Sequence, residues 1–431
     1  MKMGWNPNLL KKLPYPYQNN MPHFKTPNLT LPNLPCKVIH NAGEFEFLEF
    51  FTSKNHPSFS LLQVRFTPKN NSQTKDFFLE IKKNKQETLV RFDKYSRIAP
   101  IEIIKNALEI LMQMQDSILT HNLNRRTITP EHKLPFIKEI NDFLDFQALF
   151  AKTCEKSKQN FKEVWLEIGF GSGRHLLYNA KKYPNILHIG LEIHYPSLEQ
   201  VARQVGIQNL DNLLILAFDA RIFLELLPSN TLHKIFVHFP VPWDKKPHRR
   251  IFSQSFVAQC ARVLKQNGHL QLRTDSLEYF TFAEDLMQKF KDSFQTESFI
   301  NTQEAIVSKY EARWLREEKD IYNLECFALQ TSKDQMLDFN FSFDSTLLPR
   351  HFNAKKIIQN NYFLHLEDLF FGRKNSLLRV AFGDFNYPET RYVLQDSNLY
   401  YFKNNPLPTT INHKAHNLLN ACITESFKES L

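Results

Sequence analysis

The sequence predicts an α/β protein with a central, doubly wound, mostly parallel sheet, flanked along the chain by smaller α+β and β-rich domains. The central segment alternates short apolar runs with stretches of helical length, a pattern typical of parallel strands joined by helices. The five apolar runs cover residues 164–168, 187–193, 213–218, 235–239 and 269–272. At 431 residues the chain exceeds one ordinary core, since single domains commonly hold about 100 to 150 residues.

The flanking segments differ from the centre in their patterns. Seven prolines within residues 1–36 exclude a helix and indicate an extended arm. Period-two or short apolar patterns follow, then a helical spacing that opens at Pro100, and the β-type pattern returns after Gln330, with a final helix near 412–427. The sequence leaves open whether the two flanks pack together. The predicted divisions are a proline-rich arm at 1–36, an α+β domain at 37–135, the α/β domain at 136–330 and a β-rich extension at 331–431.

Composition and charge restrict the class of protein. Apolar residues make up 42% of the chain and aromatic residues 13%, which favours buried cores over global disorder. A net charge of +9 is compatible with a polyanionic partner such as RNA, although compositional bias explains it equally well. The five cysteines form no Cys-x-x-Cys pattern, so neither a disulfide framework nor a metal site is indicated. The sequence contains no signal-peptide or membrane-spanning apolar run, so we expect a cytoplasmic protein.

The most informative motif is a predicted strand, residues 164–168, that runs directly into three alternate glycines, Gly169, Gly171 and Gly173. Glycine suits a turn where the backbone must approach a ligand without an intervening Cβ. Glu167 lies two residues before the first glycine. A carboxylate there would repel a pyrophosphate, so the motif favours a cationic ligand and differs from the Gly-x-Gly-x-x-Gly of dinucleotide folds. A tight turn without any ligand is the alternative.

Two further acids end the next two predicted strands. Glu192 occupies the position from which a carboxylate accepts hydrogen bonds from both hydroxyls of a ribose, and Asp219 lies within reach of an adenine amino group. Ligands of open α/β sheets bind at the carboxyl ends of the strands. S-adenosyl-L-methionine has a sulfonium, an α-amino group, a ribose and an adenine, and therefore fits acids at three neighbouring strand ends. The alternative for each acid, and for Asp219 above all, is a helix N-cap.

A basic cluster follows the fourth predicted strand. Clusters of this kind supply phosphate contacts, and an aromatic residue at the edge can stack on a base for ~1 to 3 kcal/mol. A solvated surface beside a packed Trp243 is the alternative. The cluster consists of Lys245, Lys246, His248, Arg249 and Arg250.

In this order, these motifs resemble the tRNA (guanine-N7-)-methyltransferase family of class I S-adenosylmethionine-dependent methyltransferases. The resemblance rests on residues 166–171, Glu192 with the two residues that follow it, the Pro-x-Pro-Trp at 240–243, and Arg249 with Arg250. It covers about residues 161–330 and leaves out the flanks. It implies a seven-stranded Rossmann-like sheet and transfer of a methyl group from S-adenosyl-L-methionine to N7 of a guanine in the variable loop of tRNA.

The resemblance also implies roles for single residues. The tRNA partner would be held partly by a Ser-Lys-Tyr-Glu segment at 308–311, which is similar to the family's Thr-x-Tyr-Glu. The implied cofactor-binding residues are Glu167, Gly169, Gly171, Gly173, Glu192 and Asp219. The implied substrate-binding residues are Lys245, Asp275, Ser308, Tyr310 and Glu311.

One position departs from the family pattern: Val241 stands where the family has an aspartate proposed as catalytic. Guanine N7 has an in-plane lone pair and no proton, so no base is needed, and alignment alone can lower the barrier, with roughly 7 to 11 kcal/mol available from full positioning. Asp275 and Asp244 are the available acids, and we favour Asp275 for holding the N1 and N2 hydrogens of guanine. Val241 motivates a second hypothesis, a tRNA-binding protein without turnover. Glu167 and the glycine spacing disfavour a third, a NAD-dependent enzyme.

Overall fold

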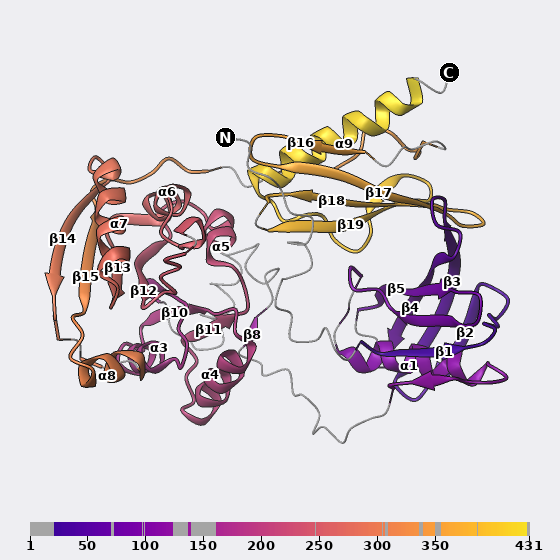
Figure 1. Cartoon of the computed structure of the whole chain (residues 1–431), viewed down its shortest axis with the longest axis horizontal. Coiled ribbons are helices and arrows are strands. Elements are labelled where there is room, and N and C mark those ends of the chain that lie inside the picture. Colours follow the sequence, from indigo (N-terminus) through magenta and orange to yellow (C-terminus); the bar gives the residue numbers. More distant parts are fainter. Residues whose placement is uncertain are drawn as a thin grey trace. The chain divides into compact units, whose positions relative to one another are not determined.

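The computed structural model divides the chain into two compact units, one formed by Met1–Thr127 with Asp338–Leu431 and the other by Ile128–Leu337 (Figure 1). Ser308 and residues 1–20 of the predicted arm lie outside the described residues. The structure describes residues 21–69, 73–96, 98, 100–123, 137–138, 161–245, 247–303, 305–306, 309–335, 339–349, 355–385 and 387–428.

The central unit, Ile128–Leu337, contains a mostly parallel sheet with the order β14-β15-β13-β12-β9-β10-β11-β8. β15 runs in the direction opposite to the other strands and pairs antiparallel with both of its neighbours, β13 and β14. The described sheet has eight strands, one more than the resemblance implies, because the two-residue β8 pairs with the edge of β11. The bounds are β8 Ile137–Lys138, β9 Glu163–Ile168, β10 Ile186–Leu191, β11 Leu213–Leu216, β12 Leu232–His238, β13 Leu264–Thr274, β14 Phe294–Ile300 and β15 Tyr322–Ala328.

Helices connect the parallel strands and cover both faces of the sheet, with α3 and α4 on one face and α5, α6 and α7 on the other (Figure 1). Serine N-caps begin two of them: Ser253 accepts from Phe256 N, and Ser276 accepts from Tyr279 N. The predicted α/β fold is therefore confirmed. No helix of the described residues is long and apolar enough to cross a membrane. The bounds are α3 Arg174–Lys182, α4 Tyr195–Ile207, α5 Ala220–Leu226, α6 Gln254–Val263, α7 Leu277–Met287 and α8 Lys309–Arg316.

The strand order reverses at β9, which lies between β10 and β12 although β12 comes later in the chain than β10 and β11. Two connections therefore leave this point in opposite directions. In open α/β sheets such a switch point leaves a crevice at the carboxyl ends of the strands, and ligands bind there. The end of β9 is the turn that carries the three glycines of the predicted motif.

The flanks form one unit with a twelve-stranded antiparallel sheet, in which β20-β19-β18-β17 continues into β3-β4-β5-β6-β1-β7, β2 pairs with β3 and β16 with β17. Two helices, α1 Ile101–Gln113 and α9 Thr410–Lys428, match the helices predicted after Pro100 and near the C-terminus. The strands are β1 His23–Thr26, β2 Cys36–His40, β3 Gly43–Ser53, β4 Phe59–Pro68, β5 Lys75–Lys83, β6 Thr88–Phe92, β7 Thr120–His121, β16 Lys356–Ile358, β17 Phe363–Phe371, β18 Ser376–Gly383, β19 Pro388–Gln395 and β20 Leu399–Tyr401.

Backbone pairing of β3 with β17 joins the two flanks, a question that the sequence left open. Ser53 Oγ donates to Asp368 Oδ2 at 2.7 Å, and Glu49 Oε1 accepts from Lys374 N at 2.6 Å. The joint also has an aromatic core with members from both flanks. Its buried residues are Phe51, Phe59, Leu61, Phe78, Phe370, Leu377, Tyr392, Leu394 and Phe402.

Asp93 lies buried at this joint, where Oδ2 accepts from Ser96 N at 2.7 Å and Oδ1 accepts from Tyr392 Oη at 3.0 Å. Burial and the nearby charge of Glu80 raise the pKa of Asp93 from its ordinary 3.8 to about 6. The folded state therefore holds a proton on Asp93 more tightly than the unfolded state does. Stability falls as the pH rises through the interval between these two pKa values.

We predict that raising the pH from 4 to 7 lowers the free energy of unfolding of the wild type relative to that of an Asp93→Asn variant, which cannot titrate at this position. The change in this difference should reach at most about 3 kcal/mol. Thermal unfolding of both proteins over this pH range measures it. Parallel pH profiles for the two proteins would contradict the prediction.

Candidate active site

The turn after β9 combines an open position with a tightly packed one. Gly169, Gly171 and Gly173 have φ values of 71°, 52° and 70°, a region that favours glycine. A Cβ added at Gly169 would meet no atom within 4 Å, whereas one at Gly173 would lie 2.4 Å from Val201 Cγ2 of α4. Gly169 N donates to Leu191 O at 2.8 Å, which ties the turn to the end of β10. The turn thus leaves room for a ligand at the strand end.

Glu167, near the end of β9, is buried, and its carboxylate is held by α3. Glu167 Oε2 accepts from His175 Nδ1 at 2.7 Å, because an ionised carboxylate can only accept. Asn179 Nδ2 lies 2.9 Å from His175 Nε2 and donates to it when the imidazole is neutral. His175 was missed by sequence reasoning, since a histidine in the first turn of a helix gives no local sign of its partner.

Glu192 follows β10 and links two neighbouring strand ends. Its Oε2 accepts from Gly171 N at 2.9 Å, while Oε1 accepts from Ile193 N at 2.8 Å and His194 N at 2.9 Å. These backbone donors hold the half-buried carboxylate in one orientation beside the glycine turn. The first two predicted cofactor acids, Glu167 and Glu192, are thus both placed at the carboxyl edge of the sheet.

Asp219 is the N-cap of α5, the alternative that the sequence kept open. Its Oδ1 accepts from Arg221 N at 2.9 Å, and the Arg221 guanidinium donates to Oδ1 at 3.0 Å and to Oδ2 at 2.7 Å. A carboxylate has about four acceptor sites. The N-cap and the ion pair therefore leave acceptor capacity for a further donor at this third strand end.

The loop after β12 has a constrained backbone, and residues of β13, α8 and the segment before α6 hold it in place. Phe239 and Trp243 both have φ values of 49°, which is uncommon for bulky residues. Phe239 N donates to Arg273 O at 2.7 Å, and the Phe239 ring packs against Trp314 of α8 with ring centroids 4.7 Å apart. Arg250, which is 3% exposed, donates from Nε to Pro242 O at 2.7 Å.

The buried position of Arg250 corrects one sequence prediction. The sequence places Arg250 in a phosphate-binding cluster, but its guanidinium is buried and pairs with Glu278 at 2.6 Å. Its role here is to hold the loop. Lys245 and Arg249 are exposed, and the Arg249 guanidinium lies 5.1 Å from the centre of the Trp243 ring. Lys246 and the side chain of His248 lie outside the described residues.

The two acids considered as substitutes for the one missing at position 241 differ in their surroundings. Val241 itself is exposed and carries no charge. The side chain of Asp244 is 57% exposed, with Oδ1 3.6 Å from Arg250 Nη2. The side chain of Asp275, directly after β13, is 22% exposed, with Oδ2 3.8 Å from Lys319 Nζ.

Of the other predicted substrate residues, Glu311 is buried against Arg273, and the side chain of Tyr310 lies outside the described residues.

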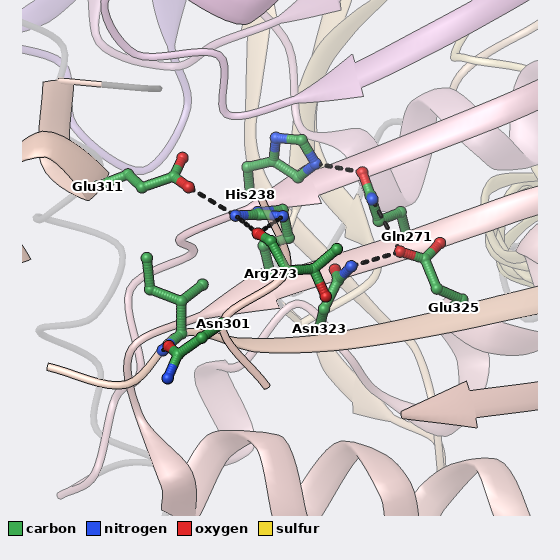
Figure 2. A network of polar contacts seen from close by, with 9 residues as sticks. His238, Gln271, Arg273, Asn301, Glu311, Asn323 and Glu325 are labelled. Carbon is green, nitrogen blue, oxygen red and sulfur yellow. Dashed lines mark hydrogen bonds and ion pairs between the residues drawn. The ribbon is translucent and has the colours of Figure 1, made fainter. Parts of the chain in front are cut away.

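A buried polar network, also missed by sequence reasoning, lies beneath this edge (Figure 2). His238 Nε2 donates to Gln271 Oε1 at 2.7 Å, and Gln271 Nε2 donates to Glu325 Oε1 at 2.9 Å. Burial, with help from the nearby His175, holds the pKa of His238 well below its ordinary 6.5. His238 is therefore neutral near pH 7, with its hydrogen on Nε2. The members of this network come from three strands, β12, β13 and β15, so no local pattern could reveal them.

Comparisons with known proteins decide the family. A family model described as "Putative methyltransferase" matches residues 162–324. A tRNA (guanine-N(7)-)-methyltransferase of Wolinella succinogenes is 39% identical over 407 residues, covering 93% of this chain and 99% of that protein. A tRNA (guanine-N(7)-)-methyltransferase of Helicobacter hepaticus is 38% identical over 420 residues, covering 94% of this chain and 100% of that protein. The chain belongs to the tRNA (guanine-N(7)-)-methyltransferase family.

These family relatives match far more of the chain than residues 161–330, the extent of the resemblance seen in the motifs. Their alignments cover 93% and 94% of it, so the flanks are shared with them. Among solved structures, the 16S rRNA methyltransferase KamB matches 42% of this chain and 93% of its own, with 17% identity and a TM-score of 0.34.

The two outer glycines of the turn offer a matched pair of substitutions. Both have positive φ, so alanine costs about 1 to 2 kcal/mol of backbone strain at either position. We predict that Gly173→Ala lowers the melting temperature more than Gly169→Ala, because only the former adds a clash with Val201. Gly169→Ala should weaken binding of S-adenosylhomocysteine more, because its methyl group fills the open position. Calorimetric unfolding and titration measure both effects, and equal effects of the two variants on both would contradict this assignment.

Proposed function

We propose that this chain transfers a methyl group from S-adenosyl-L-methionine to N7 of a guanine in the variable loop of tRNA, forming N7-methylguanosine. The observation that carries the proposal is identity of 38% to 39% with tRNA (guanine-N(7)-)-methyltransferases over more than nine tenths of the chain. The glycine turn supports it, with two fixed carboxylates at the ends of β9 and β10.

In this proposal the acids at the strand ends hold the cofactor. S-adenosyl-L-methionine supplies, when bound, an electrophilic methyl group on a positively charged sulfur. Glu167 accepts from the α-amino group through Oε1, because Oε2 already accepts from His175. Glu192, fixed by backbone amides, accepts from the ribose hydroxyls, and Asp219 accepts from the adenine amino group. The positive φ values of Gly169 and Gly171 let the backbone approach the cofactor closely.

The acids on the other side of the switch point orient the guanine. Asp275 would accept from the N1 and N2 hydrogens of the guanine, which would leave N7, on another edge of the purine, unobstructed for methyl transfer. Asp275 also balances the positive charge that develops on the guanine ring, a role that the uncharged Val241 cannot fill. Asp244 is the second candidate for this part, and its exposed carboxylate gives weaker positioning. Because N7 needs no deprotonation, this mechanism lowers the barrier by alignment and electrostatics alone.

The tRNA is held by the loop after β12 and by α8. Lys245 contacts a phosphate, and the Trp243 ring beneath Arg249 offers a stacking surface. Ser308 and Tyr310 hold the target guanosine, as the family pattern implies. Glu311 of the same family pattern contributes by fixing this segment, because its side chain is buried against Arg273.

Incubation with labelled S-adenosyl-L-methionine and unmodified tRNA, followed by reductive chain cleavage at N7-methylguanosine, tests the function and maps the position. Cleavage at a guanosine of the variable loop is expected. Binding of both S-adenosylhomocysteine and tRNA without cleavage would favour the non-catalytic alternative that Val241 motivates. Cleavage elsewhere would contradict the proposed target.

We predict that Glu192→Ala and Asp275→Ala have opposite effects on the two ligands. Glu192→Ala should weaken S-adenosylhomocysteine binding about 10- to 100-fold, because charge-assisted hydrogen bonds contribute about 1.5 to 3 kcal/mol. Its tRNA affinity should stay nearly unchanged, whereas Asp275→Ala should lower kcat or tRNA affinity with normal cofactor binding. Glu199→Ala, on the surface of α4, is the matched control. Normal methylation by both site variants would show the assignment to be wrong.

We predict that Lys245→Ala weakens binding to tRNA of any sequence and reduces the slope of log affinity against log salt by about one unit. Lys162→Ala is the control, since Lys162 is exposed and lies just before the amino end of β9, at the opposite edge of the sheet. Filter binding at several salt concentrations gives both slopes. An unchanged slope for Lys245→Ala would place this lysine off the RNA path.

A further inference from the structure

Arg273, in β13, is among the largest fully buried side chains of the chain, with 1% exposure. A buried guanidinium costs several kcal/mol unless it is paired and hydrogen-bonded. Arg273 lies two residues before Asp275, which directly follows the strand. The contacts of the Arg273 guanidinium therefore indicate the structural role of this buried charge.

The Arg273 side chain contacts the segment between β14 and β15 at two places (Figure 2). Nη2 donates to Glu311 Oε1 at 2.6 Å, and Nη1 and Nη2 lie 3.5 and 3.4 Å from the carbonyl oxygen of Thr302. The Glu311 side chain is only 6% exposed, so the ion pair is shielded from water and salt.

The segment that receives these contacts, residues 301–321, carries α8 and is called the α8 arm below. Asn301 closes its base: Asn301 N donates to Ile321 O at 2.8 Å, Asn301 Oδ1 accepts from Ile321 N at 2.9 Å, and Nδ2 donates to Asp320 at 2.8 Å. Closing the base fixes where the arm begins and ends. The direction of α8 depends on contacts further along, namely Glu311 with Arg273 and Trp314 with Phe239.

The backbone of Arg273 holds a second segment of the same region. Its carbonyl oxygen accepts from Phe239 N at 2.7 Å, at the start of the loop that contains Val241, Trp243 and Lys245. Arg273 is thus connected to three elements: Asp275 through the chain, the loop after β12 through its carbonyl group, and the α8 arm through its guanidinium.

We infer that Arg273 is a positioning residue for the RNA substrate: its guanidinium fixes the α8 arm through Glu311, so that the arm, the loop after β12 and Asp275 form one preorganised surface for the guanosine. The identity of the substrate rests on the proposed function. Lysine cannot replace this arginine fully, because the planar fork of the guanidinium reaches Glu311 and Thr302 O at once and an ammonium is a point charge.

The test compares Arg273→Met and Arg273→Lys with Arg262→Met. Arg262 is a matched control because it is a half-buried arginine of the same unit, and it donates to the carbonyl oxygens of Leu224 and Leu227 at 2.7 Å each, away from the arm. Each protein is measured for kcat and KM with tRNA, for affinity for S-adenosylhomocysteine, and for hydrogen–deuterium exchange of the α8 arm. Rates are compared at equal folded fraction, so that loss of folded protein does not count as loss of activity.

Arg273→Met should lower kcat/KM for tRNA about 100-fold, the effect of misplacing binding groups by roughly 1 Å. Exchange in the α8 arm should become faster, while affinity for S-adenosylhomocysteine changes less than about twofold. Arg273→Lys, which keeps the buried charge paired, should fold like the wild type and show an intermediate kcat/KM. Arg262→Met should leave kcat/KM and the exchange of the arm unchanged.

Two outcomes would overturn the inference: arm exchange and kcat/KM for Arg273→Met equal to those of Arg262→Met, or a wild-type kcat/KM for Arg273→Lys together with unchanged arm exchange. Failure of the proposed function is seen separately, because the wild type would then form no N7-methylguanosine. In that case arm exchange in the three variants still decides whether Arg273 fixes the arm.

Discussion

The parallel pairing of β9 with β10 on one side and with β12 on the other is the constraint on which the site depends. Its register sets Ile168 beside Leu191 and Val237, so the segments that follow these strands emerge at one edge of the sheet. Because side chains alternate between the faces of a strand, a slip of one residue in β9 would turn Glu167 to the opposite face. The hydrogen bond from Gly171 N to Glu192 then fixes the two adjacent strand ends relative to each other.

Buried charged side chains with polar partners set the shape of this edge. Glu167 is held by His175, Arg250 by the exposed Glu278, and Arg273 by Glu311. Contacts of this kind contribute little net stability, because desolvation offsets much of the attraction, but removing the partner leaves a buried charge uncompensated and is costly. Each pair therefore favours one conformation of the segment it holds. His175 lies two residues after the glycine turn, Arg250 donates to Pro242 O in the loop after β12, and Glu311 lies in the α8 arm.

The sequence predicts those features whose causes are local. The glycine turn follows from residues next to one another, and acids at strand ends follow from the alternation of strands and helices. The fate of a charged side chain depends on distant partners: Arg250 belongs to a run of basic residues, but its main partner, Glu278, is 28 residues away. The role of Arg273 required a contact with Glu311, 38 residues away. The aromatic joint of the flanks required contacts across the whole length of the chain, as between Asp93 and Tyr392.

The sheet shared by the two flanks has a consequence for biosynthesis. Because β3 pairs with β17, the sheet of the N-terminal flank lacks this one neighbouring strand until the C-terminal flank has been translated. The central unit, made in between, has all its described strands available earlier and can complete its sheet first. Until then, the side chains of Phe51 and Phe78 lack the contacts with Phe370 and Phe402 that bury them in the folded protein. A nascent chain of this kind exposes an unpaired strand edge and apolar side chains until the C-terminal flank is made, and such surfaces favour aggregation.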